Sequence, residues 1–194
     1  MTRFYVVRHG ETLFNIKRLY QGWCDSTLTE NGILQAKELY EGLYAIPFVK
    51  AVSSTSERAI DTLACIVGDR NIPMEWDKDL REVYFGQKEG DYYPDTRPSA
   101  DVDWIGYDFC GGETRDEACD RFLHGLARHA VDGNVLVVSH GAVICRFIQR
   151  CVPDLWAKRN KPNEIVPNCS VTLIDYEQGQ FHLAALPDIS YRKK

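Results

Sequence analysis

The sequence predicts an α/β sandwich of three layers with a mostly parallel central sheet. Short apolar runs of strand length alternate along the chain with segments of helical period. Three of these runs end in polar residues, and a helix begins soon after each. The last two runs flank the turn 177–179, which indicates a hairpin at one edge of the sheet. Because no linker or repeat divides the 194 residues, we expect one domain over 1–194.

The chain begins with a strand, a short helix and a long helix. The run Phe4–Val7 is apolar and of strand length, and Thr12 is a suitable cap for a short helix over 14–16. The long helix starts after the cap Thr29 and ends before Pro47. Its leucines recur at helical spacing, so one face of this helix is expected to be buried.

The next segment repeats the strand and helix pattern. The run Phe48–Val52 is a strand that leads into Ser53–Ser54. Ser56 or a neighbour caps the helix that follows, and Arg58 lies in the first turn of this helix. Met74–Trp76 is a short third strand.

The middle of the chain is less regular. Leu80–Gly90 mixes apolar side chains, carboxylates and glycines, which is typical of a loop. We interpret Asp91–Phe109, which is rich in Asp, Tyr and Pro, as an excursion over the surface, with a lid over the substrate as the alternative.

The last part of the chain returns to regular elements. The end Tyr191–Lys194 is expected to be a solvated basic tail. The expected elements are a helix from Thr114 to about Ala130, a strand over Asn134–Val138, a helix from about 142 to 148, and hairpin strands over Ser170–Ile174 and Phe181–Ala185.

Composition restricts the partners and the compartment. The net charge of −5 offers no electrostatic case for nucleic acid or an anionic membrane, so any anion site must be a local concentration of Arg and His. No apolar run approaches the length of a membrane-spanning helix. The seven cysteines are scattered and form no CxxC pair, which favours reduced thiols and argues against a zinc site. We therefore expect a cytoplasmic protein.

Polar residues cluster where three of the predicted strands end. The clusters are Arg8–Gly10, Ser53–Ser54 with Arg58 close behind, and Ser139–Gly141. If these strands are parallel neighbours, the clusters meet at one carboxyl edge of the sheet, where α/β proteins bind ligands. Arg side chains and helix N-termini both suit a tetrahedral oxyanion. One cluster alone would be equally consistent with a surface Arg and a structural His.

The ligand is predicted to be a phosphate group. Two His residues with Glu11, Asp25 or Glu82 could also form a metal site. Because guanidinium groups repel a cation and attract phosphate, Arg8 and Arg58 favour the phosphate.

Phosphoryl transfer needs a nucleophile, charge stabilisation and a proton donor to the leaving oxygen. A neutral imidazole can be the nucleophile and become a phosphohistidine, while the arginines and the second His hold the phosphoryl oxygens. Glu82 is the best proton donor, because its apolar neighbours favour a raised pKa. Glu11 is the second candidate.

The ordered set of motifs resembles that of the histidine phosphatase superfamily, in its phosphoglycerate mutase-like branch. The motifs extend over residues 8–170 and therefore cover nearly the whole chain. They are Arg8–Thr12 with Asn15; Gly22–Asp25 with Leu28–Thr29, Gly32 and Gln35–Ala36; Ser53–Ser54 with Arg58–Ala59 and Thr62; Leu80 with Glu82, Phe85–Gly86 and Glu89–Gly90; Gly112–Glu113; Ser139–Gly141; and Asn168–Ser170. One departure is Lys88, which stands where Trp is common in the family and leaves the substrate shape open.

The resemblance implies a phosphoglycerate mutase-like fold and a role for each matched residue. His9 would be phosphorylated, and Glu82 would be the general acid and then the base. No metal and no cofactor are expected. The residues implied to bind the transferring phosphoryl group are Arg8, Arg58 and His140, and those implied to contact phosphate or substrate are Asn15, Gln21, Gly22 and Gly141.

A metal-independent phosphomonoesterase of the histidine acid phosphatase type is the favoured function. The glycolytic mutases of the family carry an extended middle insertion and a C-terminal tail, whereas this chain has only the excursion 91–109 and a short end. A mutase acting by phosphoryl transfer is the alternative, and a non-catalytic phospho-ligand binding protein is a third. The expected partner is a small phosphorylated metabolite, and both a monomer and a homodimer remain open.

Overall fold

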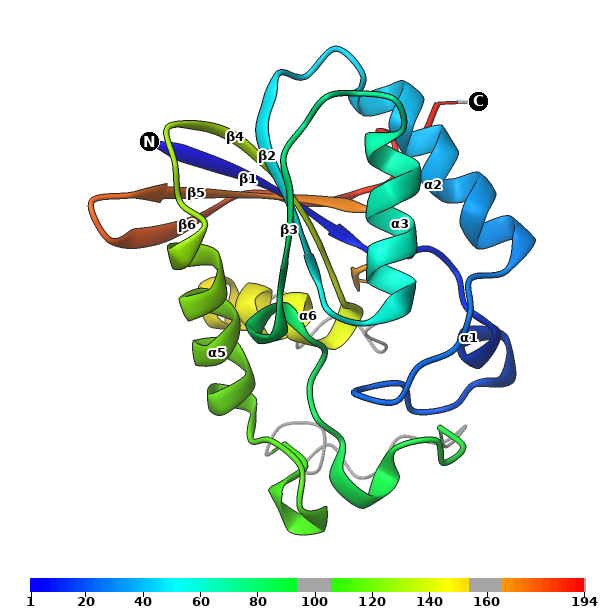
Figure 1. Cartoon of the computed structure of the whole chain (residues 1–194). Helices are drawn as coiled ribbons and strands as arrows, with labels where there is room; N and C mark the ends of the chain where they lie inside the picture. The colour runs from blue at the N-terminus through cyan, green and yellow to red at the C-terminus, as the bar shows by residue number, and fades with distance from the viewer. Residues whose placement is uncertain (94–105, 154–164, 194) are drawn as a thin grey trace.

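The computed structural model describes residues 1–93, 106–153 and 165–193. In these residues the sheet has six strands in the order β3-β2-β4-β1-β5-β6 (Figure 1). The strands are β1 (Thr2–Arg8), β2 (Phe48–Ser54), β3 (Met74–Asp77), β4 (Gly133–Ser139), β5 (Val171–Glu177) and β6 (Gln180–Asp188). β3, β2, β4 and β1 are parallel, β5 is antiparallel to β1, and β6 is antiparallel to β5. The predicted mostly parallel sheet with a hairpin at its edge is confirmed.

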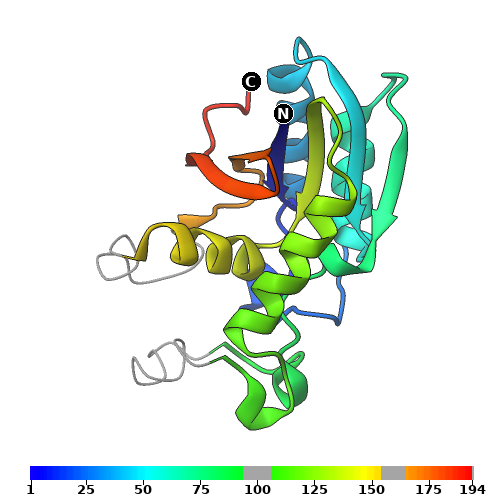
Figure 2. The same cartoon turned by 90° about the vertical axis from the view of Figure 1, so that its left-hand side faces the viewer.

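The helices cover both faces of the sheet. α2 and α3 lie on one face and α5 and α6 on the other, as the two views in Figures 1 and 2 show. The three-layer sandwich is therefore confirmed. The helices are α1 (Leu13–Lys17), α2 (Glu30–Leu43), α3 (Glu57–Val67), α5 (Arg115–Arg128) and α6 (Gly141–Cys151).

Alternate residues of the inner strands fill two apolar cores. In β1, Val6 packs with the core under α5 and α6, and its neighbour Val7 packs with the core under α2 and α3. Val137 and Val138 of β4 divide in the same way. Because successive strand side chains point to opposite faces, a sheet covered on both sides needs continuous apolar runs, and the sequence has them.

The register of the inner strands brings their carboxyl ends level. Arg8 at the end of β1 lies opposite Ser139 at the end of β4, and Ser53 of β2 lies opposite Val138. The order of the strands cannot be read from the sequence. In the structure, this order places β4 between β1 and β2. The three polar clusters therefore meet at one edge, as predicted.

The starts of α1 and α2 are capped locally, whereas the start of α3 is capped from a distance. Thr12 forms a capping box with Asn15 at α1, and Thr29 caps α2. Ser56 occupies the cap position of α3, but its side chain makes no capping hydrogen bond. The carboxylate of Asp25 accepts the N–H of the first residue of α3 instead, at 2.6 Å.

The C-terminal end is docked, so the prediction of a solvated tail is wrong for the described residues 191–193. Tyr191 packs edge-on against Tyr5, and the N–H of Lys193 donates to the carbonyl oxygen of Glu38 in α2 at 3.0 Å. The guanidinium of Arg192 lies 3.7 Å from the carboxylate of Glu38. The ring of Tyr5 and the carboxylate of Glu38 therefore hold this short basic end against the rest of the protein.

Most of the excursion 91–109 lies outside the described residues, so its path over the surface and the alternative role as a lid both stay predictions. Its two described ends pack into the core: Tyr93 and Tyr107 both contact the ring of Tyr20. None of the helices within the described ranges is both long and apolar enough to span a membrane. All seven cysteines are free thiols.

Candidate active site

His9 lies at the end of β1 and is held as a neutral imidazole. Its N–H backbone group donates to the carbonyl of Ser139 at 3.0 Å, and its ring Nδ1 lies 2.8 Å from the carbonyl oxygen of Gly10. A carbonyl can only accept, so Nδ1 carries the proton and Nε2 has the free lone pair. Burial and the guanidinium groups of Arg58 and Arg8 hold the pKa of His9 well below its usual range.

Gly10 lets the chain turn away from the sheet directly against α2. A Cβ at this position would come within 2.5 Å of the carbonyl oxygen of Gly32. Its N–H donates to the hydroxyl of Thr62 at 3.0 Å, and Thr62 in turn donates to the carbonyl of Arg58 at 2.7 Å. The backbone of Gly10 therefore lies in close contact with the backbone of α2.

His140 stands next to His9, with 5.2 Å between the ring centroids. Its Nδ1 lies 3.0 Å from Nη2 of Arg58, and its Nε2 lies 2.8 Å from the hydroxyl of Ser54. Because Arg only donates, Nδ1 accepts and Nε2 carries the proton toward Ser54. Burial, Arg58 and His9 hold the pKa of His140 well below its usual range. Nε2–H is therefore the hydrogen-bond donor of this ring, and in this structure it is directed at Ser54.

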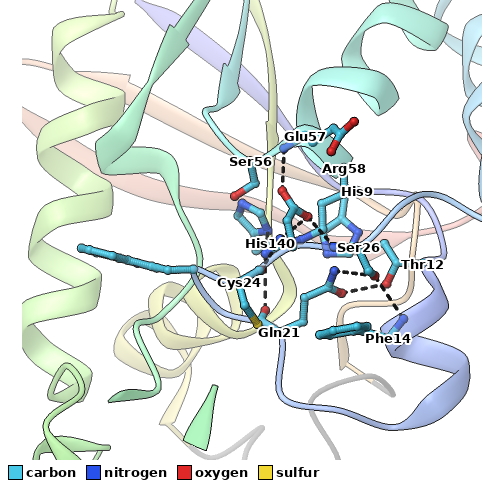
Figure 3. A network of polar contacts seen from close by, with 12 residues as sticks. His9, Thr12, Phe14, Gln21, Cys24, Ser26, Ser56, Glu57, Arg58 and His140 are labelled. Atoms are coloured by element: carbon cyan, nitrogen blue, oxygen red, sulfur yellow. Dashed lines mark hydrogen bonds and ion pairs between the residues drawn. The ribbon is translucent and has the colours of Figure 1, made fainter. Parts of the chain in front are cut away.

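Arg58 is fully buried and joins α3 to the loop after α1 (Figure 3). Its Nη1 donates to the carboxylate of Asp25 at 2.7 Å. Among the described residues, Nε has no hydrogen-bond partner. The other acceptors are the carbonyl oxygens of Cys24, Gln21 and Gly22 and the ring of His140.

Gln21 and Gly22 shape the loop that surrounds this guanidinium. The side chain of Gln21 accepts from the hydroxyl of Thr12 at 2.7 Å and donates to that of Ser26 at 3.0 Å (Figure 3). The N–H groups of Gly22 and of the two residues after it all donate to the carboxylate of Glu89. Gln21 and Gly22, which were predicted to contact the substrate, therefore lie beside Arg58. The side-chain amide of Gln21 and the N–H of Gly22 are engaged in holding the loop.

Arg8 passes directly under the start of α6. It is buried, and its Nη1 donates to the carbonyl of Val166 at 2.7 Å. A Cβ on Gly141 would lie 3.0 Å from Nε of Arg8, so the glycine gives this side chain room. Burial lowers the pKa of Arg8 to about 10, which leaves the guanidinium charged at neutral pH.

Asn15 faces the same region from α1. Its Oδ1 accepts from the N–H of Thr12 and from the side chain of Asn168, both at 3.2 Å. In the described part of the chain its Nδ2 makes no hydrogen bond. This amide is thus a donor that an anion in the site could use.

Glu82 lies on the loop after the short 3-10 turn Lys78–Leu80 and is buried against the N-terminus of α6. Its carboxylate accepts from the N–H groups of Val83 at 2.9 Å, Ala142 at 2.8 Å and Val143 at 2.7 Å. Burial raises the pKa of Glu82, and these three N–H groups oppose the rise. The predicted acid is therefore placed beside His140 and Arg8.

Glu11, the second candidate for the acid, is turned toward α2. Its carboxylate accepts from the hydroxyl of Thr29 at 2.8 Å, and its backbone N–H donates to Gln35 at 3.0 Å. The geometry therefore favours Glu82. In the described ranges, no three His, Cys, Asp or Glu side chains are grouped so that they could hold a metal ion.

Two residues have larger roles than the sequence pattern indicates. Asp25, considered there only as a metal ligand, both caps α3 and pairs with Arg58. Arg121 bonds the loop that carries Glu82, including the carbonyl of Glu82 itself at 3.0 Å. Asp25 follows a turn signal that could have drawn attention to it. Arg121 has no local signal, because its partners lie far away in the sequence.

The arrangement fits in-line attack on a phosphoryl group. A neutral imidazole with a free lone pair, two buried guanidinium groups and a buried carboxyl group meet at one edge of the sheet. Groups of these kinds can supply a nucleophile, charge stabilisation and a proton donor.

Comparison with known proteins agrees with this geometry. The model of the family described as "Histidine phosphatase superfamily (branch 1)" matches residues 4–189. An adenosylcobalamin/alpha-ribazole phosphatase of Salmonella typhimurium is 34% identical over 158 residues, which cover 76% of this chain and 78% of that protein. A broad-specificity phosphatase of Saccharomyces cerevisiae is 30% identical over 188 residues, covering 90% and 79%. The crystal structure of a phosphoglycerate mutase from Bacillus anthracis has a TM-score of 0.79 at 28% identity, covering 98% and 94%.

Proposed function

This chain belongs to the histidine phosphatase superfamily, and from that premise we propose that it hydrolyses small phosphomonoesters through a phosphohistidine on His9. The observation that carries the proposal is the tautomer of His9. Its Nδ1–H is committed to the carbonyl of Gly10, so the Nε2 lone pair is free, and the guanidinium groups of Arg58 and Arg8 are close enough to help lower the pKa of the ring.

In the first step, Nε2 of His9 attacks phosphorus and the bond to the ester oxygen breaks. Arg8 and Arg58 stabilise the charge on the phosphoryl oxygens, and Glu82 gives its proton to the leaving oxygen. In the second step, the Glu82 carboxylate removes a proton from the attacking water, the P–N bond breaks, and inorganic phosphate leaves. His9 returns to its neutral form.

Glu82 suits both steps because opposing influences act on its pKa, with a net rise. Burial favours the neutral acid, whereas three backbone N–H groups favour the carboxylate. A group whose two forms are close in free energy can give a proton in one step and take one in the next.

The substrate is inferred to be a small phosphorylated metabolite. Two relatives are named as phosphatases, one of them of broad specificity. The likeness to a phosphoglycerate mutase keeps phosphoryl transfer as the second candidate. Release of inorganic phosphate from small phosphomonoesters, measured against conversion of 3- to 2-phosphoglycerate, separates the two. Efficient conversion with little hydrolysis would overturn the phosphatase assignment.

The chemistry of the donors argues for a reaction that needs no metal. We expect the hydrolysis rate to stay the same in EDTA, and a loss that added divalent metal restores would contradict this part of the proposal.

The covalent step is tested by trapping. Rapid acid-free quenching with a ³²P-labelled substrate should label the wild type, and His9→Ala should lose both the label and the activity while its melting temperature is kept. His182→Ala is the matched control, because His182 is exposed on β6. Full labelling of His9→Ala would refute the role of His9.

A further inference from the structure

Arg121 on α5 uses its whole guanidinium group to hold the segment that carries Glu82. Its Nε and Nη2 form a two-point ion pair with the carboxylate of Glu113, at 2.7 and 2.8 Å. Both side chains are mostly buried, with 16% and 17% of their surfaces exposed. A paired geometry of this kind fixes direction as well as charge.

The same guanidinium also binds three carbonyl oxygens of the acid-bearing segment. Nη1 donates to Asp79 at 2.8 Å and to Arg81 at 3.1 Å, and Nη2 donates to Glu82 at 3.0 Å. The side chain of Arg121 thus binds the carbonyl oxygens of two residues that precede Glu82 and the carbonyl oxygen of Glu82 itself.

Glu113 ties down the other side of Glu82. Its carboxylate accepts the N–H of Tyr84 at 2.8 Å, and its own N–H donates to the carbonyl of Tyr84 at 2.9 Å. The ion pair therefore holds the backbone before, at and after Glu82, in residues 81–85, which form no helix or strand.

We propose that Arg121, acting through Glu113, is a positioning residue that sets where the carboxyl group of Glu82 meets the leaving oxygen. This inference rests on the proposed role of Glu82 as the acid. A displacement of about 1 Å at a reacting group can cost about 100-fold in rate, so a loosened backbone at Glu82 reduces proton transfer before it affects binding. Lys at this position would keep the charge and lose the fork that reaches five acceptors.

The experiment compares esters with good and poor leaving groups. In Arg121→Met, kcat/KM for an alkyl phosphate should fall about 10- to 100-fold, and kcat/KM for p-nitrophenyl phosphate should fall less than about 3-fold, because a stable leaving anion needs little help from an acid. Arg121→Lys should not restore kcat/KM for the alkyl phosphate. Glu113→Gln, like Arg121→Met, should lower kcat/KM for the alkyl phosphate more than for p-nitrophenyl phosphate. Arg128→Met is the matched control, since Arg128 lies on the same helix and pairs with the side chains of Asp77 and Asp79.

Each outcome decides a different point. Equal losses for both esters in Arg121→Met, or full recovery in Arg121→Lys, would overturn the positioning role. If Arg121→Met does not fold, Arg121→Lys and Glu113→Gln carry the same comparison. Glu82→Gln tested in parallel separates the two proposals: if it shows no preference for good leaving groups, the acid role itself fails.

Discussion

Removal of the Asp25 carboxylate should weaken both the fold and phosphate binding. One oxygen of Asp25 pairs with Nη1 of Arg58 at 2.7 Å, and the other accepts the N–H of Glu57 at the start of α3 at 2.6 Å. Arg58 is fully buried, whereas the side chain of Asp25 is 26% exposed. The loss in Asp25→Ala is therefore that of a partly screened ion pair plus a helix cap.

The magnitude follows from these two contacts. A hydrogen bond to a charged group contributes about 1.5–3 kcal/mol, and loss of an N-cap costs about 1 kcal/mol. Arg58 keeps its carbonyl acceptors, so the lower end of the first range applies. We expect Asp25→Ala to lose about 2.5–3 kcal/mol of unfolding free energy, and Asp25→Asn to lose about half of that.

Urea unfolding measures the free energy of unfolding. The inhibition constant of inorganic phosphate, as a competitive inhibitor, measures how well Arg58 binds phosphate. The inhibition constant should rise in both variants, since Arg58 loses one of the contacts that fix the position of its guanidinium group. Ser56→Ala is the control, because Ser56 occupies the cap position without a capping bond, and it should lose less than about 1 kcal/mol. A loss in Asp25→Ala no larger than that in the control, with unchanged inhibition, would refute the reasoning.

The remaining predictions concern the buried titrating groups. Because burial raises the pKa of Glu82 and the acid must be protonated for the first step, kcat/KM for alkyl phosphates should fall as pH rises through that pKa; a pH profile of Glu82→Gln should lack this decline. The folded pKa values of His9 and His140 lie below their unfolded values, so the stability that these groups contribute is present above about pH 6.5 and is lost as pH falls. Urea unfolding at pH 7 and pH 5 should show a larger loss for the wild type than for His140→Gln, and equal losses would contradict the prediction. Ser54→Ala removes the acceptor of the His140 Nε2–H and should lower kcat/KM about 5- to 150-fold, which corresponds to the roughly 1–3 kcal/mol of an unsatisfied buried donor. An unchanged rate would show that Ser54 does not orient the ring.

Local patterns were enough to predict most of the elements. The run Phe4–Val7 and the cap Thr12 both lie where they were expected, as β1 and the start of α1. The hairpin was also expected, although β6 continues through Pro187 to Asp188. Pro is tolerated there because an edge strand has one side without a neighbouring strand.

Long-range contacts were not readable in the same way. The cap of α3 comes from Asp25, about thirty residues earlier in the chain, and not from the adjacent Ser56. The end around Tyr191 is packed although its composition is that of a solvated tail. In each case the partner is chosen by the packing of distant elements, which leaves no mark on the sequence near the residue.

By itself the sequence determined the strand and helix alternation and the polar residues Arg8, His9 and His140 at the ends of strands. These properties depend on the period of the apolar residues and on the residue type at each strand end, and both are local. The tertiary structure alone decided the strand order, the tautomers of the two His rings, and the placement of Glu82 instead of Glu11 beside them. Those features depend on which backbone groups of distant segments face each other, and only the folded chain specifies that.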